Sequence, residues 1–257
     1  MIVDDHTHIF ETGRGPRGEL ASADDLILQM DEAGIDVSVV IPLPGCASNE
    51  FVQIECKKHD KRLVALYTPD FTLPRERVVP EMAKFIASND VRGIKIHPRL
   101  QSVTIDDPAV KDVLAWAADA DQPVVFDVFP FGPEVPDPRL GPLAYVATAL
   151  ELPRLTLVLA HAGGYKPIEA FLAAKASPNI MVDVSFTFAY FRGSSPATDL
   201  AWLCGRLPPD RLLYGSDWPH QGLRAYLDET RSMIAHVPES TRAALLGKNS
   251  RRLYRLG

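Results

Sequence analysis

Two histidines separated by a single threonine lie near the start of the chain, in the segment Ile2-Val3-Asp4-Asp5-His6-Thr7-His8. The apolar residues before them predict a β-strand, and because alternate side chains of a strand share a face, His6 and His8 point the same way. Their Cα atoms would lie about 6.6 Å apart, so that two imidazoles can converge on one metal ion at about 2.0–2.1 Å. Taken alone, the pair is equally consistent with polar residues at an exposed strand end.

Four further expected strands also end in ionisable residues, which are Lys95 and His97, Asp127, His161, and Asp217. One such end has a simple explanation, because strands emerge into solvent. Five at the same end of one sheet indicate a shared site. In a closed barrel the first and eighth strands are neighbours, so His6, His8 and Asp217 become an N,N,O set suited to zinc or manganese.

Strand-like and helix-like segments alternate along the whole chain. The expected strands cover residues 2–8, 37–41, 63–67, 91–97, 123–127, 155–161, 180–184 and 211–217. The expected helices cover 22–33, 49–59, 75–87, 107–120, 140–150, 168–176 and 196–206, with a Pro-rich loop after the fifth strand and two helical stretches after the eighth. Strands that are continuous apolar runs are typical of a parallel sheet covered on both faces.

Eight such units predict an α/β fold, a (β/α)₈ TIM barrel forming a single domain over residues 1–257, with the active site at the carboxyl ends of the strands. An open doubly wound sheet is the alternative, but no Gly-x-Gly-x-x-Gly segment follows any strand.

Composition narrows the class of protein. A net charge of -6 without a basic stripe argues against a nucleic-acid partner, and no apolar run approaches the roughly 18 residues that a membrane helix needs. The early acidic pair argues against a signal peptide. Three cysteines without Cys-x-x-Cys spacing suggest reduced thiols rather than disulfides or a thiolate zinc site, so we expect a cytoplasmic protein. The sequence leaves open whether the protein forms a homo-oligomer.

Several segments resemble the amidohydrolase superfamily over the whole chain: His-Thr-His, Gly93-Ile-Lys-Ile-His-Pro98, Ala160-His-Ala-Gly-Gly164, Tyr214-Gly-Ser-Asp-Trp-Pro-His220 and Leu246-Gly-Lys-Asn-Ser-Arg-Arg-Leu-Tyr254. The similar branch is the amidohydrolase-related group, which holds lactonases such as 2-pyrone-4,6-dicarboxylate lactonase and non-oxidative decarboxylases of aromatic and muconate acids. Each motif alone is weak, whereas His-x-His together with Gly-Ser-Asp-Trp-Pro is a specific pairing.

The resemblance implies roles for particular residues. His6 and His8 match the metal ligands of the first strand, and Asp217 matches the eighth-strand ligand and proton shuttle. His161 matches the sixth-strand histidine that contacts the substrate or the attacking water. Asp127 stands at a metal-ligand position where metal-dependent members usually carry histidine. We therefore expect a divalent metal, zinc first and manganese second, to be weakly held or absent, and a lactonase rather than a decarboxylase.

The expected function is a hydrolase that opens a lactone or related ester of a small anionic substrate. Asp217 would deprotonate a water and return the proton to the leaving oxygen. The alternative is a metal-dependent carboxy-lyase that releases CO₂, and a non-catalytic binding barrel is the third class. The expected substrate-binding residues are Lys95, His97, Arg99, Arg192 and Trp218.

Each binding residue has a second interpretation. Lys95 could be carboxylated, as in binuclear relatives, or pair with Asp127, and His97 could merely cap a loop. A loop arginine such as Arg99 or Arg192 is usually a solvated charge, although guanidinium suits carboxylates. Trp218 and Tyr165 could wall the pocket or pack in the core. The aromatic set Phe186, Phe188, Tyr190 and Phe191 predicts a mobile flap over the site or a loop packed elsewhere, and Cys46 lacks a partner that would make it a nucleophile.

Overall fold

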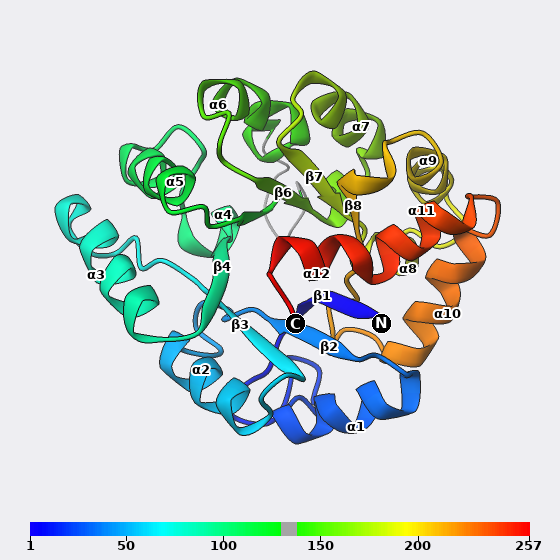
Figure 1. The fold of residues 1–257 in the computed structure, drawn as a ribbon, viewed down its shortest axis with the longest axis horizontal. Coiled ribbons are helices and arrows are strands. Elements are labelled where there is room, and N and C mark those ends of the chain that lie inside the picture. Colours follow the sequence, from blue (N-terminus) through cyan, green and yellow to red (C-terminus); the bar gives the residue numbers. More distant parts are fainter. Residues whose placement is uncertain (130–137) are drawn as a thin grey trace.

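Eight parallel strands form the centre of the molecule in the computed structural model, which describes residues 1–129 and 138–257 (Figure 1). Part of the Pro-rich loop expected after the fifth strand lies outside the described residues. The strands, paired in chain order, are β1 (Val3–Thr7), β2 (Val37–Val40), β3 (Leu63–Tyr67), β4 (Val91–Ile96), β5 (Val124–Asp127), β6 (Leu157–Ala160), β7 (Ile180–Asp183) and β8 (Leu212–Leu213).

The ring is completed between β1 and the segment that follows β8. Thr7 bridges Trp218, and the Asp217 amide donates to the His6 carbonyl over 2.8 Å. The predicted single-domain (β/α)₈ barrel is therefore confirmed.

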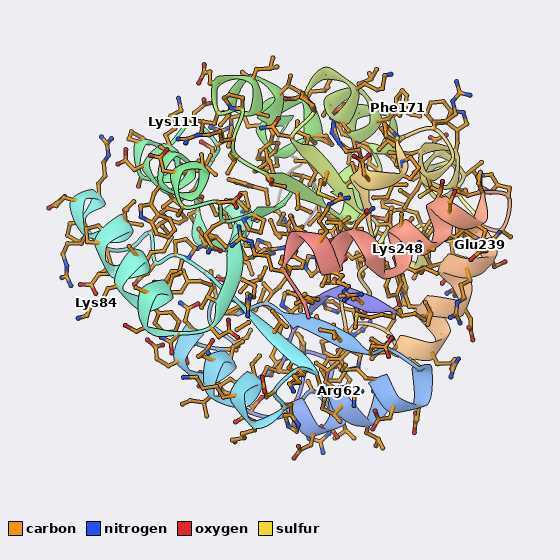
Figure 2. The ribbon with its side chains drawn as sticks, viewed as in Figure 1. Arg62, Lys84, Lys111, Phe171, Glu239 and Lys248 are labelled. Carbon is orange, nitrogen blue, oxygen red and sulfur yellow. The ribbon has the colours of Figure 1, made fainter. Side chains whose placement is uncertain are left out.

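Helices surround the sheet, and α1, α2, α3, α5, α6, α7, α9 and α10 form the outer ring (Figure 1). They are α1 (Ala23–Ala33), α2 (Asn49–Lys58), α3 (Arg75–Ser88), α4 (Pro98–Gln101), α5 (Pro108–Asp119), α6 (Val146–Glu151), α7 (Pro167–Ala176), α8 (Thr187–Tyr190), α9 (Ser195–Cys204), α10 (Leu223–Met233), α11 (Glu239–Ala243) and α12 (Asn249–Leu253). Lys84, Lys111 and Glu239 extend from the outer faces (Figure 2). None of the described helices has the length and apolar character needed to cross a membrane.

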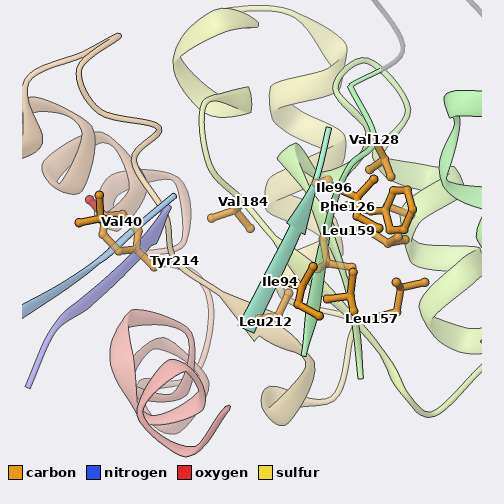
Figure 3. Packing of buried hydrophobic residues seen from close by; sticks show 14 of the residues in the cluster. Val40, Ile94, Ile96, Phe126, Val128, Leu157, Leu159, Val184, Leu212 and Tyr214 are labelled. Atoms are coloured by element: carbon orange, nitrogen blue, oxygen red, sulfur yellow. The ribbon is translucent and has the colours of Figure 1, made fainter. Parts of the chain in front are cut away.

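Side chains alternate across the strands and separate two apolar clusters. Outward residues such as Ile94, Phe126 and Leu159 pack beneath the helices (Figure 3). Inward residues fill the barrel toward the amino ends of the strands, and they include Val39, Leu66, Val125, Val158, Met181 and Leu213. Tyr254, the residue that follows α12, belongs to the same cluster. The next inward-facing residues of β4, β5 and β7, two positions further along each strand, are Lys95, Asp127 and Asp183. The sequence thus changes from apolar to ionisable where the strands end.

Six strands end before the expected residue, five of them by one residue and β8 by four, and after β6 and β8 the backbone enters left-handed conformations. The eighth strand was expected to reach residue 217, but β8 ends at Leu213 and Asp217 has a φ of 62°. The sixth ends at Ala160, since His161 and Ala162 have φ values of 61° and 47°. These are left-handed conformations that side-chain-bearing residues seldom adopt, and such residues gather at functional sites.

Candidate active site

A cavity of about 660 Å³ opens at the carboxyl ends of the strands. Its lining combines ionisable side chains with an apolar wall, and comprises His6, His8, Leu43, Lys95, His97, Arg99, Leu100, Asp127, Phe129, His161, Phe186, Tyr190, Asp217 and His220. Most of the residues that the sequence singled out are therefore brought together.

The first-strand histidines face Asp217 across the point where the barrel closes. Asp217 Oδ1 lies 3.2 Å from His8 Nε2 and 3.6 Å from His6 Nε2. One extra residue in β1 relative to β2 shifts the register between Asp4 and Thr7, and such a bulge re-aims the side chains that follow it. This explains how Val3 fills the barrel interior while His6 and His8 reach the cavity.

The opposite ring nitrogens of these histidines are anchored. His6 Nδ1 lies 2.7 Å from Asp183 Oδ2, and His8 Nδ1 lies 2.9 Å from the Ile41 carbonyl. A ring nitrogen that faces an oxygen acceptor carries the proton, so Nδ1 is protonated in both rings.

His161 completes the cluster. Its ring centroid is 4.8 Å from that of His6, and one potential ligand atom from each of His6, His161 and Asp217 lies within 4.8 Å of the others. Although burial alone would lower the pKa of His161, its hydrogen bond to Asp127 raises it above the ordinary value. Burial would raise the pKa of Asp217, but the hydrogen bond from His8 and the charges of His161 and His6 hold it well below its usual range. Asp217 is thus ionised at neutral pH.

Lys95 lies against His6, with its Nζ 3.2 Å from His6 Nε2. Burial lowers the pKa of Lys95. Burial, followed by the Lys95 charge, lowers the pKa of His6 to about 3, so His6 is neutral near pH 7. Within the described residues Lys95 makes no ion pair with Asp127 at 4 Å or less, the arrangement that the sequence left open.

Asp127 is instead the centre of a second group of side chains. Its Oδ2 lies 2.9 Å from His97 Nε2, 3.3 Å from an Arg99 guanidinium nitrogen and 3.5 Å from His161 Nε2. His97 also caps α4 through its Nδ1, so it both lines the cavity and caps a loop. Burial opposes ionisation of Asp127, yet His97 and His161 hold its pKa well below the usual range. Its oxygens are therefore occupied by protein donors.

Other expected residues lie away from the cavity. The Arg192 side chain is 67% exposed and pairs with Glu229, whose oxygens lie 2.7 Å away. Trp218 is buried in the core, and Tyr165 is an exposed surface residue, so neither lines the cavity.

The members of the aromatic set after β7 lie in different surroundings. Phe186 and Tyr190 line the cavity and contact Phe129, whereas Phe188 is buried in the core. Cys46 is a half-buried free thiol whose pKa burial raises, which weakens it as a nucleophile.

Three polar residues of the site were not predicted from the sequence. Asp183 and Ser185 contact His6, and His220 lines the cavity with its Nε2 3.9 Å from Asp217 Oδ2. Asp183 ends an apolar run as Asp127 and His161 do, so the same strand-end pattern would have found it. His220 lies in the motif that carried the family resemblance.

The residues present fit a divalent metal. Imidazole nitrogens with one carboxylate suit zinc, and ligating histidines normally donate their other ring N–H to a carboxylate or carbonyl, as His6 and His8 do. Lys95 opposes this fit, because its Nζ occupies the lone-pair side of His6 Nε2.

The comparisons with known proteins agree with the fold. A family model described as amidohydrolase matches residues 3–256. An uncharacterised TIM-barrel protein of Bordetella bronchiseptica has a TM-score of 0.84 at 18% identity, covering 99% of this chain and 98% of that one. A probable 2-pyrone-4,6-dicarboxylic acid hydrolase of Acinetobacter baumannii, with citric acid bound, has a TM-score of 0.71 at 16% identity and 99% coverage of both chains.

A 2,6-dihydroxybenzoate decarboxylase from Rhizobium has a TM-score of 0.75 at 17% identity, covering 99% of this chain and 98% of that one. No curated protein sequence matches. At these identities the structural likenesses show the fold alone. The family match spans nearly the whole chain, and the chain therefore belongs to the amidohydrolase family.

Proposed function

We propose that this amidohydrolase-family protein is a hydrolase that opens a lactone or related ester of a small carboxylated substrate. The observation that carries the proposal is the convergence of an ionised Asp217 with His6, His8 and His161 on one cavity that also holds cationic side chains.

Asp217 is the proton carrier of the proposed reaction. Its carboxylate takes a proton from a water held beside His6 and His8, while the water oxygen bonds to the substrate carbonyl carbon. The ring C–O bond then breaks, and Asp217 gives the proton to the departing oxygen, so that base becomes acid. His161, with its raised pKa, donates a hydrogen bond to the carbonyl oxygen as negative charge develops there.

Arg99 is the proposed anchor for the substrate carboxylate. It lines the cavity, and only one of its guanidinium nitrogens pairs with Asp127. A planar guanidinium with a free N–H can bind a carboxylate. Phe129, Phe186 and Tyr190 form the facing apolar wall, which suits a flat unsaturated ring.

A bound divalent metal would supply Lewis acidity to the carbonyl and the water, and His6, His8 and Asp217 would hold it. We propose that it is zinc and that it binds weakly. Asp127, at the position where histidine is usual, is already occupied by His97 and Arg99, and Lys95 places a cationic group beside His6.

The test is a side-by-side screen of carboxylated lactones and aromatic acids with metal-stripped and zinc-restored protein. Ring opening is followed by ultraviolet absorbance and acid release, and decarboxylation by CO₂. We expect lactone opening that survives chelation. Lactone opening that requires stoichiometric zinc would support the proposed hydrolysis and contradict the proposed weak binding of zinc. Metal-dependent CO₂ release from an aromatic acid, without lactone opening, would overturn the proposal.

A further inference from the structure

Asp183, the last residue of β7, and Ser185, two residues later, lie behind the cavity histidines. Asp183 and Ser185 are 1% and 0% exposed. Asp183 Oδ2 lies 2.7 Å from His6 Nδ1, and the Ser185 hydroxyl lies 2.6 Å from the same carboxylate oxygen and 3.0 Å from His161 Nδ1. One short segment therefore touches both histidines on the ring nitrogen opposite Nε2.

Counting donors and acceptors fixes where the protons lie. An ionised carboxylate accepts only, and Asp183 Oδ1 already receives the Ser185 backbone N–H over 2.7 Å. The Ser185 hydroxyl proton is therefore spent on Asp183 Oδ2. The hydroxyl then offers a lone pair to His161, so His161 Nδ1 must carry the hydrogen of that contact.

The same count of donors and acceptors assigns the proton of His6. Its Nδ1 faces Asp183 Oδ2, which cannot donate, so Nδ1 carries the proton. Its Nε2 keeps a lone pair, in agreement with the Lys95 ammonium, a donor, 3.2 Å away. Asp183 thus acts on His6 directly and on His161 through the orientation of one hydroxyl.

We propose that Asp183 and Ser185 are positioning residues that hold His6 and His161 in the Nδ1–H form, so that both rings exchange protons or bind a cation only through Nε2. This rests on the proposed function for its catalytic consequence, but not for the tautomers themselves. For His161, Nδ1 also faces the Ser185 carbonyl at 3.4 Å and Nε2 lies 3.5 Å from Asp127 Oδ2, so Nε2 is the atom at which the ring gains and loses its second proton.

Asp183→Asn is the informative change, because the amide keeps the shape and replaces one acceptor by a donor. If the NH₂ faces His6 and Ser185, the hydroxyl must accept from it and donate to His161 Nδ1, which moves the neutral His161 proton to Nε2. His6 is moved in the same way. If the amide is flipped, its NH₂ meets the Ser185 backbone N–H, which is a clash of two donors.

The experiment is ¹⁵N NMR of the histidine ring nitrogens in the metal-stripped protein without substrate, at a pH where the rings are neutral. We expect Nδ1–H signals for His6 and His161 in the wild type and Nε2–H signals for at least one of them in Asp183→Asn. Ser185→Ala should change the His161 tautomer but not that of His6, whose Nδ1 loses the 3.2 Å contact with the hydroxyl and keeps the 2.7 Å contact with Asp183. An Nε2–H form of His6 in the wild type, or unchanged tautomers in a folded Asp183→Asn protein, would overturn the inference.

Ser38→Ala is the matched control, a buried strand serine whose hydroxyl has no partner in the described part of the chain. If Asp183→Asn does not fold, the His161 signals of Ser185→Ala decide, and unchanged signals there overturn the role of the hydroxyl. Once a substrate is found, kcat should fall about 10–100-fold in Asp183→Asn with little change in KM, as is usual when a partner that orients a ligand is lost. Because the NMR result needs no substrate, its failure is distinct from failure of the proposed function.

Discussion

Replacing Lys95 by methionine should tighten zinc binding. Lys95 Nζ lies 3.2 Å from His6 Nε2. A zinc ion bound to that nitrogen at about 2.1 Å would be at most about 5.3 Å from the ammonium. At an effective dielectric constant of about 20, a double and a single positive charge at that separation repel by about 6 kcal/mol.

Loss of the Lys95 proton is the cheaper route. Deprotonating a lysine of pKa about 10.4 at pH 7 costs about 5 kcal/mol, and burial lowers the pKa of Lys95, which reduces that cost further. Zinc binding should therefore expel one proton from Lys95. Lys95→Met removes both the charge and the proton while keeping a side chain of similar length, so we expect zinc affinity to rise at least ~10-fold, since each 1.4 kcal/mol is a factor of ten.

Isothermal titration of metal-stripped protein with zinc, in two buffers of different ionisation enthalpy, gives both the affinity and the number of protons released. The Lys95→Met protein should release one proton fewer than the wild type, and Lys111→Met, which removes an exposed lysine of α5, should match the wild type. Weaker zinc binding by Lys95→Met would refute the reasoning, because it would show that Lys95 supports the metal, as a carboxylated lysine does in binuclear relatives.

Three further changes test other parts of the site. Asp217→Asn should lower kcat about 10²–10⁴-fold in a protein that still folds, since the amide keeps the shape but cannot accept the proton, and wild-type turnover on the substrate found would demote Asp217 to a structural role. Gly215→Ala should destabilise the fold by about 1–3 kcal/mol in urea unfolding, because the new Cβ would lie 2.5 Å from His6 Cβ and 2.8 Å from Asp5 Oδ1, whereas Gly222→Ala, with nothing nearer than 3.8 Å, should be nearly neutral. Burial raises the pKa of Asp4 from 3.8 to about 7, so the stabilising contribution of the protonated carboxyl is present below pH 3.8 and is lost as the pH rises through about 7. The free energy of unfolding of the wild type should fall by up to ~4 kcal/mol between pH 4 and 8. An equal fall in Asp4→Asn would contradict this.

The sequence was sufficient for the fold and for most of the cavity. Eight apolar runs specify eight strands, and the ionisable residues that end five of them mark the end at which the site forms, which is why His6, Lys95, Asp127 and His161 could be named in advance. The helix start at Ser22 was equally readable, because a capping box is a local pattern.

Residues whose position depends on loop geometry could not be predicted in this way. Arg192 follows β7 in the chain, but the turn at α8 carries it outward to Glu229, and no local pattern encodes that path. Asp4 and Asp5 are both buried by the closed barrel, which their charge alone does not indicate. A residue's charge indicates exposure only when the neighbouring strands do not enclose it.

The C-terminal helix has a consequence for how the chain is made. Tyr254, 1% exposed, packs against inward residues of several strands, including Val3 near the opposite end of the chain, and α12 lies across the strands beside β1 (Figure 1). During vectorial synthesis β1 leaves the ribosome well before its partners, the segment that follows β8 and helix α12, are translated. The barrel therefore closes only after translation of these residues, and until then the acidic pair of β1 remains hydrated, so a nascent chain stalled before residue 254 should be sensitive to proteases.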